Sequence, residues 1–184
     1  MRKLLVVLAL TAIPTSIFAQ SAETMQKALD SEAKKLQAWS SDPAIIAAVK
    51  AQNAKRTPLA QIQKTDEQWI AGKAEDVVKQ VTTGACADRL RALVSASAAY
   101  AETFVMDDQG ALVCATLKTS DYWQGDEAKW QRAFSSGKGA LFIDRPKFDD
   151  SASTRLAQIS VPVMEQGVAI GAITVGIAMD KLTR

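Results

Sequence analysis

Residues 119–130 are the stretch of this chain whose side chains are best suited to chemistry. They place three large aromatic residues, three acids and one lysine within twelve positions, in a chain with only four tryptophans and two tyrosines. Acids and a lysine can supply proton transfer, whereas aromatic rings with a few charges suit the recognition of a small ligand. We expect this stretch to be a loop that leads into a short helix and is held by a rigid sheet.

An enzymatic role for these residues is disfavoured because the chain contains no histidine. Ser-His-Asp and Cys-His catalytic groups and histidine-ligated zinc are therefore excluded. A lysine base, or a carboxylate pair about 5–9 Å apart as in glycoside hydrolysis, remains an alternative, with Asp121, Asp126, Lys129 and Asp149 as candidates. Their spacing does not require such chemistry, so we expect a protein that is not an enzyme, with no catalytic residues, no metal and no cofactor.

The first nineteen residues have the pattern of a secretory signal peptide. Arg2 and Lys3 precede ten mostly apolar residues, and Pro14 and the small residue Ala19 follow. Because a membrane anchor needs about 20 apolar residues, we predict cleavage after Ala19 and a soluble periplasmic product. Cleavage would leave 20 basic and 20 acidic residues with no lysine- or arginine-dense face. Nucleic acid and anionic membrane surfaces are therefore not expected partners.

The chain contains two cysteines, Cys86 and Cys114, which are relevant to the predicted periplasmic location. An even pair in an oxidising compartment favours one disulfide, which would stabilise the fold by about 3 kcal/mol. Two buried free thiols are the alternative.

Residues 20–100 are predicted to form a helical scaffold. Apolar residues at steps of three and four mark one face of a first helix, at Met25, Leu29, Ala33, Leu36 and Trp39. Asp42 and Pro43 are typical of the cap and first turn of a second helix that ends near residue 54. Thr65 and Gln68 have the spacing of a capping box before another helix, and a helix is predicted over residues 85–98. We expect Trp39 and Trp69 to lie in the core.

Residues 101–184 are predicted to form the sheet. Residues 103–106 and 111–116 flank a turn that contains Asp107, Asp108 and Gly110, whose spacing lacks the features of a calcium loop. A short helix from Gly125 to about Ser135 and a strand over residues 140–143 follow, then a polar loop over residues 144–153. Residues 156–163 and 168–179 form a last hairpin. The expected fold is α+β, one domain, with long N-terminal helices packed on a five-stranded antiparallel sheet.

Five segments then show a more specific resemblance. Residues 104–110, 119–130, 148–149, 158–163 and 170–176 look like the corresponding motifs, in the same order, of a single Cache (PDC-type, PAS-like) extracytoplasmic sensor domain. The resemblance covers residues 24–182 and is strongest from residue 100 onward. Cache domains sense ligands for bacterial chemoreceptors, histidine kinases and diguanylate cyclases.

The resemblance implies a pocket over the central sheet. Its implied lining comes from the loop and helix after the second strand, the following polar loop and the floor of the sheet: Asp121, Tyr122, Trp123 and Trp130; Arg145, Phe148 and Asp149; and Gln158 and Ser160. Arg145 would suit a carboxylate, the acids and rings an ammonium group, and an amino acid would use both. In the alternative interpretation these groups pair with each other, cap the helix or fill the core.

Membrane-bound relatives carry a transmembrane helix and an effector after this domain, whereas this sequence ends at Arg184. We therefore expect a freestanding exported domain that binds a small polar metabolite (an organic acid, an amino acid or an amine). It would signal through a membrane receptor, kinase or cyclase, and a homodimer through the N-terminal helix would follow the family. The alternative is a periplasmic protein–protein regulatory module with a vestigial pocket.

Overall fold

The computed structural model describes residues 15–149 and 154–182, and their side chains from residue 23 onward except that of Asp149. The helices of the front half are α1 (Thr15–Leu36), the 3-10 turn η1 (Gln37–Ser41), α2 (Pro43–Asn53), α3 (Leu59–Ile70), α4 (Glu75–Thr82) and α5 (Ala85–Val94). The back half contains β1 (Tyr100–Met106), β2 (Leu112–Ala115), α6 (Ala128–Phe134), η2 (Ser135–Gly137), β3 (Phe142–Ile143), β4 (Lys147–Asp149), β5 (Thr154–Glu165), β6 (Val168–Ala178) and α7 (Met179–Leu182).

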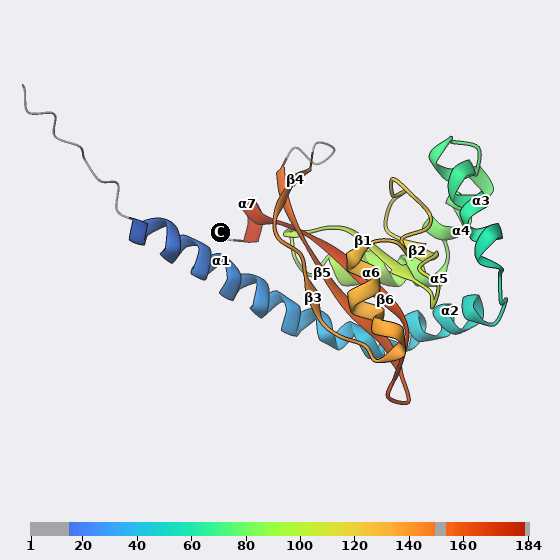
Figure 1. The fold of residues 1–184 in the computed structure, drawn as a ribbon, viewed down its shortest axis with the longest axis horizontal. Helices are drawn as coiled ribbons and strands as arrows, with labels where there is room; N and C mark the ends of the chain where they lie inside the picture. Colours follow the sequence, from blue (N-terminus) through green and yellow to red (C-terminus); the bar gives the residue numbers. More distant parts are fainter. Residues whose placement is uncertain (1–14, 150–153, 183–184) are drawn as a thin grey trace, which may run out of the picture.

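The strands form one antiparallel sheet in the order β2-β1-β6-β5-β3, with β4 also paired to β5. Figure 1 shows α1 running along this sheet and extending beyond it at one end, whereas α3 and α4 lie at the other end. The predicted α+β fold, with its N-terminal helix packed on an antiparallel sheet, is confirmed. The sheet has one strand more than expected, because residues 147–149 of the predicted polar loop pair with β5.

The two faces of the sheet are built from alternate residues of the same strands, since successive side chains of a strand point to opposite faces. Ala157, Ile159 and Val161 of β5 belong to the main core, which α1, α2 and α5 cover. On the opposite face Phe104 and Met106 of β1 pack with Ala133 of α6 in a second core cluster. Helices α1, α2 and α5 of the front half therefore cover one face of the sheet, whereas α3, α4 and α6 contribute to the core on the other face.

The start of α2 shows that the front half contains two separate helices. The carboxylate of Asp42 accepts hydrogen bonds from the N–H groups of Ala44 and Ile45 at 3.0 and 3.3 Å, and Pro43 occupies the first helical position. Proline is tolerated best at this position. Helix α1 therefore ends, the chain turns through η1, and α2 begins at Pro43. Trp39 and Trp69 are buried, as predicted.

Three helix boundaries differ from the sequence-based expectation. Thr65 does not begin a helix; it lies within α3, where its hydroxyl donates to the carbonyl of Gln61 at 3.0 Å. The helix expected from Gly125 begins at Ala128, so Glu127 precedes it. The helix predicted to end at residue 98 ends at Val94, and residues 96–99 lead into β1.

The predicted disulfide is present and joins the helical layer to an edge strand. Cys86 of α5 bonds Cys114 of β2 with their Cα atoms 5.9 Å apart, so the alternative of two free thiols is wrong. Gly171 of β6 allows a close approach of two backbones. A Cβ atom there would lie 2.3 Å from the carbonyl oxygen of Met106, so no larger residue fits between β6 and β1.

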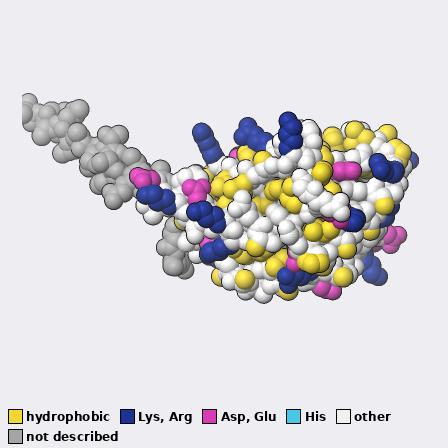
Figure 2. Space-filling model, turned by 90° about the horizontal axis from the view of Figure 1, so that it is seen from below, with side chains coloured by type: hydrophobic (Ala, Val, Ile, Leu, Met, Phe, Trp, Pro, Cys, Tyr) yellow, Lys and Arg dark blue, Asp and Glu magenta, His cyan; other side chains and the backbone are white. Residues whose placement is uncertain are grey.

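The beginning of α1 overlaps the predicted signal peptide. Residues 1–14 lie outside the described residues, whereas residues 15–19 form the first turns of α1, so cleavage after Ala19 stays a prediction. Acidic and basic side chains follow one another along α1 where it extends from the body (Figure 2), as in the pair of Glu23 and Lys27, 2.6 Å apart. Within the two described ranges, no helix combines the length and apolar character that a membrane span requires.

Candidate functional site

A hollow of about 280 Å³ lies on the face of the sheet that α6 partly covers. Its walls come from the loop before α6, from α6 itself, from β4 and the segment that precedes it, and from β5. The lining residues are Ser120, Glu127, Lys129, Asp144, Arg145, Lys147, Phe148, Leu156 and Gln158. This volume is close to the lower end of small-molecule sites, so the hollow suits a small ligand.

The floor of the hollow is set by the alternation of β5. Gln158 faces the hollow because its neighbours Ala157 and Ile159 face the main core. The Gln158 amide N–H donates to the Glu102 carboxylate on β1 at 3.3 Å. Gly176 on the strand between them leaves room for this contact, since a Cβ atom there would lie 3.3 Å from Cγ of Glu102. The amide carbonyl of Gln158 is then the group turned away from Glu102.

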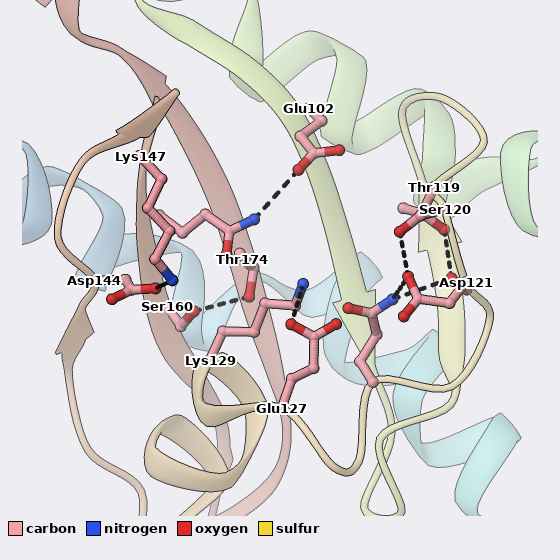
Figure 3. Close-up of polar contacts among 12 residues, drawn as sticks. Glu102, Thr119, Ser120, Asp121, Glu127, Lys129, Asp144, Lys147, Ser160 and Thr174 are labelled. Carbon is pink, nitrogen blue, oxygen red and sulfur yellow. Dashed lines mark hydrogen bonds and ion pairs between the residues drawn. The ribbon is translucent and has the colours of Figure 1, made fainter. Parts of the chain in front are cut away.

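Two ion pairs and one further cation line the hollow. The ammonium of Lys129 on α6 lies 2.9 Å from the Glu127 carboxylate and 5.3 Å from the centre of the Phe104 ring. Lys147 lies 2.8 Å from the Asp144 carboxylate. Figure 3 shows the two pairs on separate walls of the site, with Glu102 on the sheet behind them. These two cations are therefore already neutralised within the protein.

Arg145 is the cation of the hollow without such a partner. Its backbone N–H donates to the Asp144 carboxylate at 2.8 Å, but no hydrogen bond or ion pair joins its guanidinium to any other residue of the described part. A guanidinium in this position can bind a carboxylate through two parallel hydrogen bonds. Three cations, Lys129, Arg145 and Lys147, and two anions, Glu127 and Asp144, therefore line the hollow. The lining carries one positive charge in excess.

Asp144 is held in its ionised form by these neighbours. Partial burial on its own would raise the pKa of the Asp144 carboxyl, but the hydrogen bonds from the Lys147 ammonium and the Arg145 N–H outweigh burial and lower that pKa. The same contact with Asp144 raises the pKa of the Lys147 ammonium. The pair thus remains fully charged across the neutral range of pH.

The predicted aromatic residues lie beside the hollow, and their polar atoms bond to the protein. Tyr122 is buried against Trp69 with ring centres 5.7 Å apart, and its hydroxyl accepts from Gln52 at 3.3 Å. Burial raises the pKa of the Tyr122 hydroxyl. The backbone N–H groups of Tyr122 and Trp123 both donate to one carboxylate oxygen of Asp66, at 2.7 and 3.0 Å. This segment is thus fixed to α3.

The two tryptophans of the loop are fixed to the β1–β2 turn. The indole N–H of Trp123 donates to the carbonyl of Gln109, and that of Trp130 donates to the carbonyl of Asp107, both at 2.9 Å. Trp130 also stacks on Phe134, with ring centres 5.0 Å apart. Neither indole N–H is free to bind a ligand.

Asp121 is engaged within its own loop. Its carboxylate accepts from the amide of Gln124 at 2.8 Å and from the hydroxyl of Ser120. The Gln124 amide also donates to the Asp121 carbonyl at 3.0 Å, which fixes the orientation of the amide. The side-chain carbonyl oxygen of Gln124 is buried and has no hydrogen-bond partner among the described residues. Figure 3 shows Asp121 with Thr119 and Ser120, away from the ion pair of Lys129 and Glu127.

The structure therefore brings some of the predicted ligand-binding residues together and separates others. Arg145, Phe148 and Gln158 line the hollow, with Phe148 64 % exposed at its rim. Ser160 is fully buried beneath it and shares a hydrogen bond of 2.8 Å with Thr174. Asp121, Tyr122, Trp123 and Trp130 line the neighbouring loop and core instead, and the side chain of Asp149 lies outside the described residues. Whether any of these residues contacts a ligand stays a prediction.

Several lining residues were not identified from the sequence: Ser120, Glu127, Lys129, Asp144, Lys147 and Leu156. Leu156 shares the alternation of Gln158 and Ser160, which was a usable signal. Lys129 is a catalytic candidate in the sequence, and Glu127 falls in the first turn of the helix predicted from Gly125. Asp144 and Lys147 lie in the segment interpreted as a polar loop.

No three acidic or cysteine side chains in residues 23–148 and 154–182 are grouped so that they could hold a metal ion. A larger hollow of about 480 Å³ lies where α3 meets α4, beside Gly72 and Ala74. It contains none of the predicted ligand-binding residues. The hollow around Arg145 is therefore the better candidate for a ligand site.

No protein-family model and no curated protein sequence matches the chain. Solved structures with a similar fold include the sensor domain of the V. cholerae histidine kinase DctB, at 12% identity and a TM-score of 0.42 over 91% of this chain and 57% of that chain. Another is the ligand-binding domain of the Pseudomonas aeruginosa PAO1 amino acid chemoreceptor PctC in complex with GABA, at 15% identity and a TM-score of 0.40 over 67% and 60%. A third is the sensory domain of the Campylobacter jejuni chemoreceptor Tlp3 with isoleucine bound, at 12% identity and a TM-score of 0.37 over 86% and 64%.

These similar structures are sensor or ligand-binding domains of a histidine kinase and of chemoreceptors. The likeness concerns the fold, and the chain spans less than two thirds of the length of each of the three. The ligand and the partner of this chain do not follow from it.

Proposed function

We propose that this chain is an exported sensor domain that binds a small carboxylate-bearing metabolite in the hollow around Arg145 and signals through a membrane-bound partner. The observation that carries the proposal is the Arg145 guanidinium, which has no partner among the described residues at a hollow where the other two cations are paired. A carboxylate would complete its hydrogen bonds and remove the excess positive charge. Organic acids and amino acids share this group.

The remaining lining supports a binding role. Phe148 and Leu156 offer apolar area, and the carbonyl of Gln158, whose amide N–H is engaged by Glu102, offers an acceptor. An amino acid would use that acceptor for its ammonium group, whereas an organic acid would leave it to water. The proposal is for recognition by binding alone, without a chemical step.

The test is calorimetric titration of the purified protein with acetate, succinate and L-alanine, and with succinamide and L-alaninamide as counterparts without a carboxylate. We expect at least one carboxylate to bind and its amide counterpart to bind more weakly. Arg145→Gln should weaken carboxylate binding roughly two- to fivefold, because Arg145 is exposed and an exposed ion pair contributes no more than about 1 kcal/mol. Arg155→Gln is the matched control, because Arg155 is exposed on β5 opposite Phe148 but does not line the hollow.

Two outcomes would contradict this proposal: no binding of any carboxylate, or equal losses in Arg145→Gln and Arg155→Gln. The first would favour the alternative of a protein–protein regulatory module with a vestigial pocket. In either case the segment of α1 that extends from the sheet (Figure 1) is the surface we propose for docking to a receptor, kinase or cyclase, or to a second copy of this chain. Sedimentation of the purified protein would test the homodimer.

A further inference from the structure

Lys129 and Glu127 differ in how much each depends on their ion pair. The side chain of Lys129 is 11% exposed, whereas that of Glu127 is 39% exposed. A poorly hydrated ammonium needs a nearby anion, because water cannot replace one. A half-exposed carboxylate can be hydrated instead. Glu127 can therefore leave Lys129 at little cost, provided that another anion takes its place.

The position of Lys129 does not depend on Glu127 alone. Its ammonium lies 5.3 Å from the centre of the Phe104 ring, a contact that holds a cation through the ring quadrupole. Phe104 is buried in the sheet beneath α6. Lys129 would thus stay at the wall of the hollow when its carboxylate partner is exchanged.

We propose that Glu127 is a specificity-determining residue, an internal counter-ion that a ligand carboxylate must displace from Lys129. This inference rests on the proposed function of the hollow. Glu127 is only two residues from Lys129, so its carboxylate competes at a high effective concentration. A simple anion that contacts Lys129 alone gains nothing over Glu127. A ligand that also reaches Arg145 gains a contact that Glu127 does not make.

The second ion pair of the hollow is not expected to act in this way. Lys147 is 74% exposed, so water can hydrate its ammonium whether or not Asp144 is present. Exchange of an anion at Lys147 would therefore change the binding energy little, since exposed ion pairs contribute little. The asymmetry between the two pairs makes the inference specific to Glu127.

The experiment is calorimetric titration of wild type and Glu127→Gln with succinate and L-alanine, and with their amide counterparts. Glu127→Gln removes the competing charge and keeps the length of the side chain. We expect the variant to bind the carboxylate probe roughly two- to fivefold more tightly, the equivalent of one weak ion pair. Binding of the amide counterpart should not change, because it does not displace Glu127.

Two controls separate displacement from a general effect of charge. Asp126→Asn removes the adjacent acid, which is exposed and does not line the hollow, so it should leave the affinity unchanged. In a Lys129→Gln background, Glu127→Gln should no longer raise the affinity, because no cation remains to compete for. Thermal unfolding of each variant verifies that it is folded.

Each outcome decides the inference. Equal gains in Glu127→Gln and Asp126→Asn, or a gain that persists without Lys129, would overturn it while the proposed function stands. If wild type binds the carboxylate and Glu127→Gln binds it equally or more weakly, this inference is overturned. The proposed function would still stand. If neither wild type nor Glu127→Gln binds any carboxylate, the proposed function and this inference both fall.

Discussion

Two regions of the molecule lie side by side on one face of the sheet and differ in what their polar groups are bonded to. The aromatic wall, formed by Tyr122, Trp123 and Trp130, has each indole N–H and the tyrosine hydroxyl bonded to another part of the protein. The charged corner, formed by Lys129, Arg145, Lys147 and Gln158, has partners that are partly exposed or, for the Arg145 guanidinium, no partner in the part of the chain described.

The difference indicates which region holds the fold and which is available to a ligand. A group whose hydrogen bond is already made within the protein must give that bond up before it can bind a ligand. We therefore propose that the aromatic wall serves the structure, by fixing the 119–127 loop to α3 and to the β1–β2 turn. The charged corner can change partners without breaking the core.

Loss of the Tyr122 ring should break the aromatic wall most severely. Tyr122 is 8% exposed and packs against the fully buried Trp69, so Tyr122→Ala should lower the free energy of unfolding by roughly 3–5 kcal/mol. Tyr122→Phe keeps the ring and loses only a hydrogen bond of 3.3 Å from Gln52, so it should change stability by less than about 1 kcal/mol. Urea unfolding measures both.

The same pair of variants sharpens the comparison when binding is measured. If the aromatic wall is structural, Tyr122→Phe binds the carboxylate probe as tightly as wild type does. A large loss of affinity in this folded variant would instead place the Tyr122 hydroxyl in the ligand site, as the resemblance to Cache domains implies.

Asp66 provides a smaller test of how the wall is held. One oxygen of its carboxylate accepts from the N–H groups of Tyr122 and Trp123, so Asp66→Ala leaves two donors without that acceptor. We expect a loss of roughly 1–3 kcal/mol in the free energy of unfolding, measured in urea. Asp66→Asn retains an oxygen in the same place and should lose less. Equal losses in the two variants would show that the charge, and not the acceptor, holds the loop.

The sequence was sufficient to predict the features that depend on neighbouring residues. Asp42 and Pro43 predicted the start of α2. The disulfide between Cys86 and Cys114 followed from the parity of cysteines and the expected compartment. Each of these inferences needs only local stereochemistry or composition.

The remaining features depend on contacts between distant residues. The hydrogen-bond partners of the aromatic wall could not be predicted because they lie between 14 and 70 positions away in the sequence. β4 was not predicted because three residues give no clear alternation, and its strand character comes from pairing with β5. Glu127 precedes α6 and does not lie within the helix expected from Gly125, and its carboxylate pairs with Lys129.

The pH dependence of stability gives the smallest effects and distinguishes the two regions by sign. Asp107, whose carbonyl accepts from Trp130 of the aromatic wall, is 3% exposed. Burial raises the pKa of the Asp107 carboxyl above the ordinary value of 3.8. The hydrogen bonds from the N–H groups of Gln109 and Ala111 lower that pKa, but burial outweighs them. Asp144 in the charged corner has a lowered pKa, because the contacts from Lys147 and Arg145 outweigh its partial burial.

The signs follow from which state binds the proton first. As pH falls through the raised pKa of Asp107 towards 3.8, the folded protein is protonated before the unfolded chain, so this group adds stability. The contribution of Asp144 is present above 3.8 and is lost as pH falls from 3.8 through its lowered pKa. Asp107→Asn should therefore remove a gain in the free energy of unfolding on acidification. Asp144→Asn should remove a loss in the same quantity.

Urea unfolding of wild type, Asp107→Asn and Asp144→Asn between pH 3 and pH 7 would measure these slopes. At pH 7 Asp107→Asn should be neutral or stabilising, because one amide oxygen can still accept from Gln109 and Ala111 while the buried charge is removed. Asp144→Asn should change the free energy of unfolding at pH 7 by only a few tenths of a kcal/mol, since its partner Lys147 is largely exposed. Slopes of the same sign in both variants would mean that the two regions do not differ in the way their acids are held.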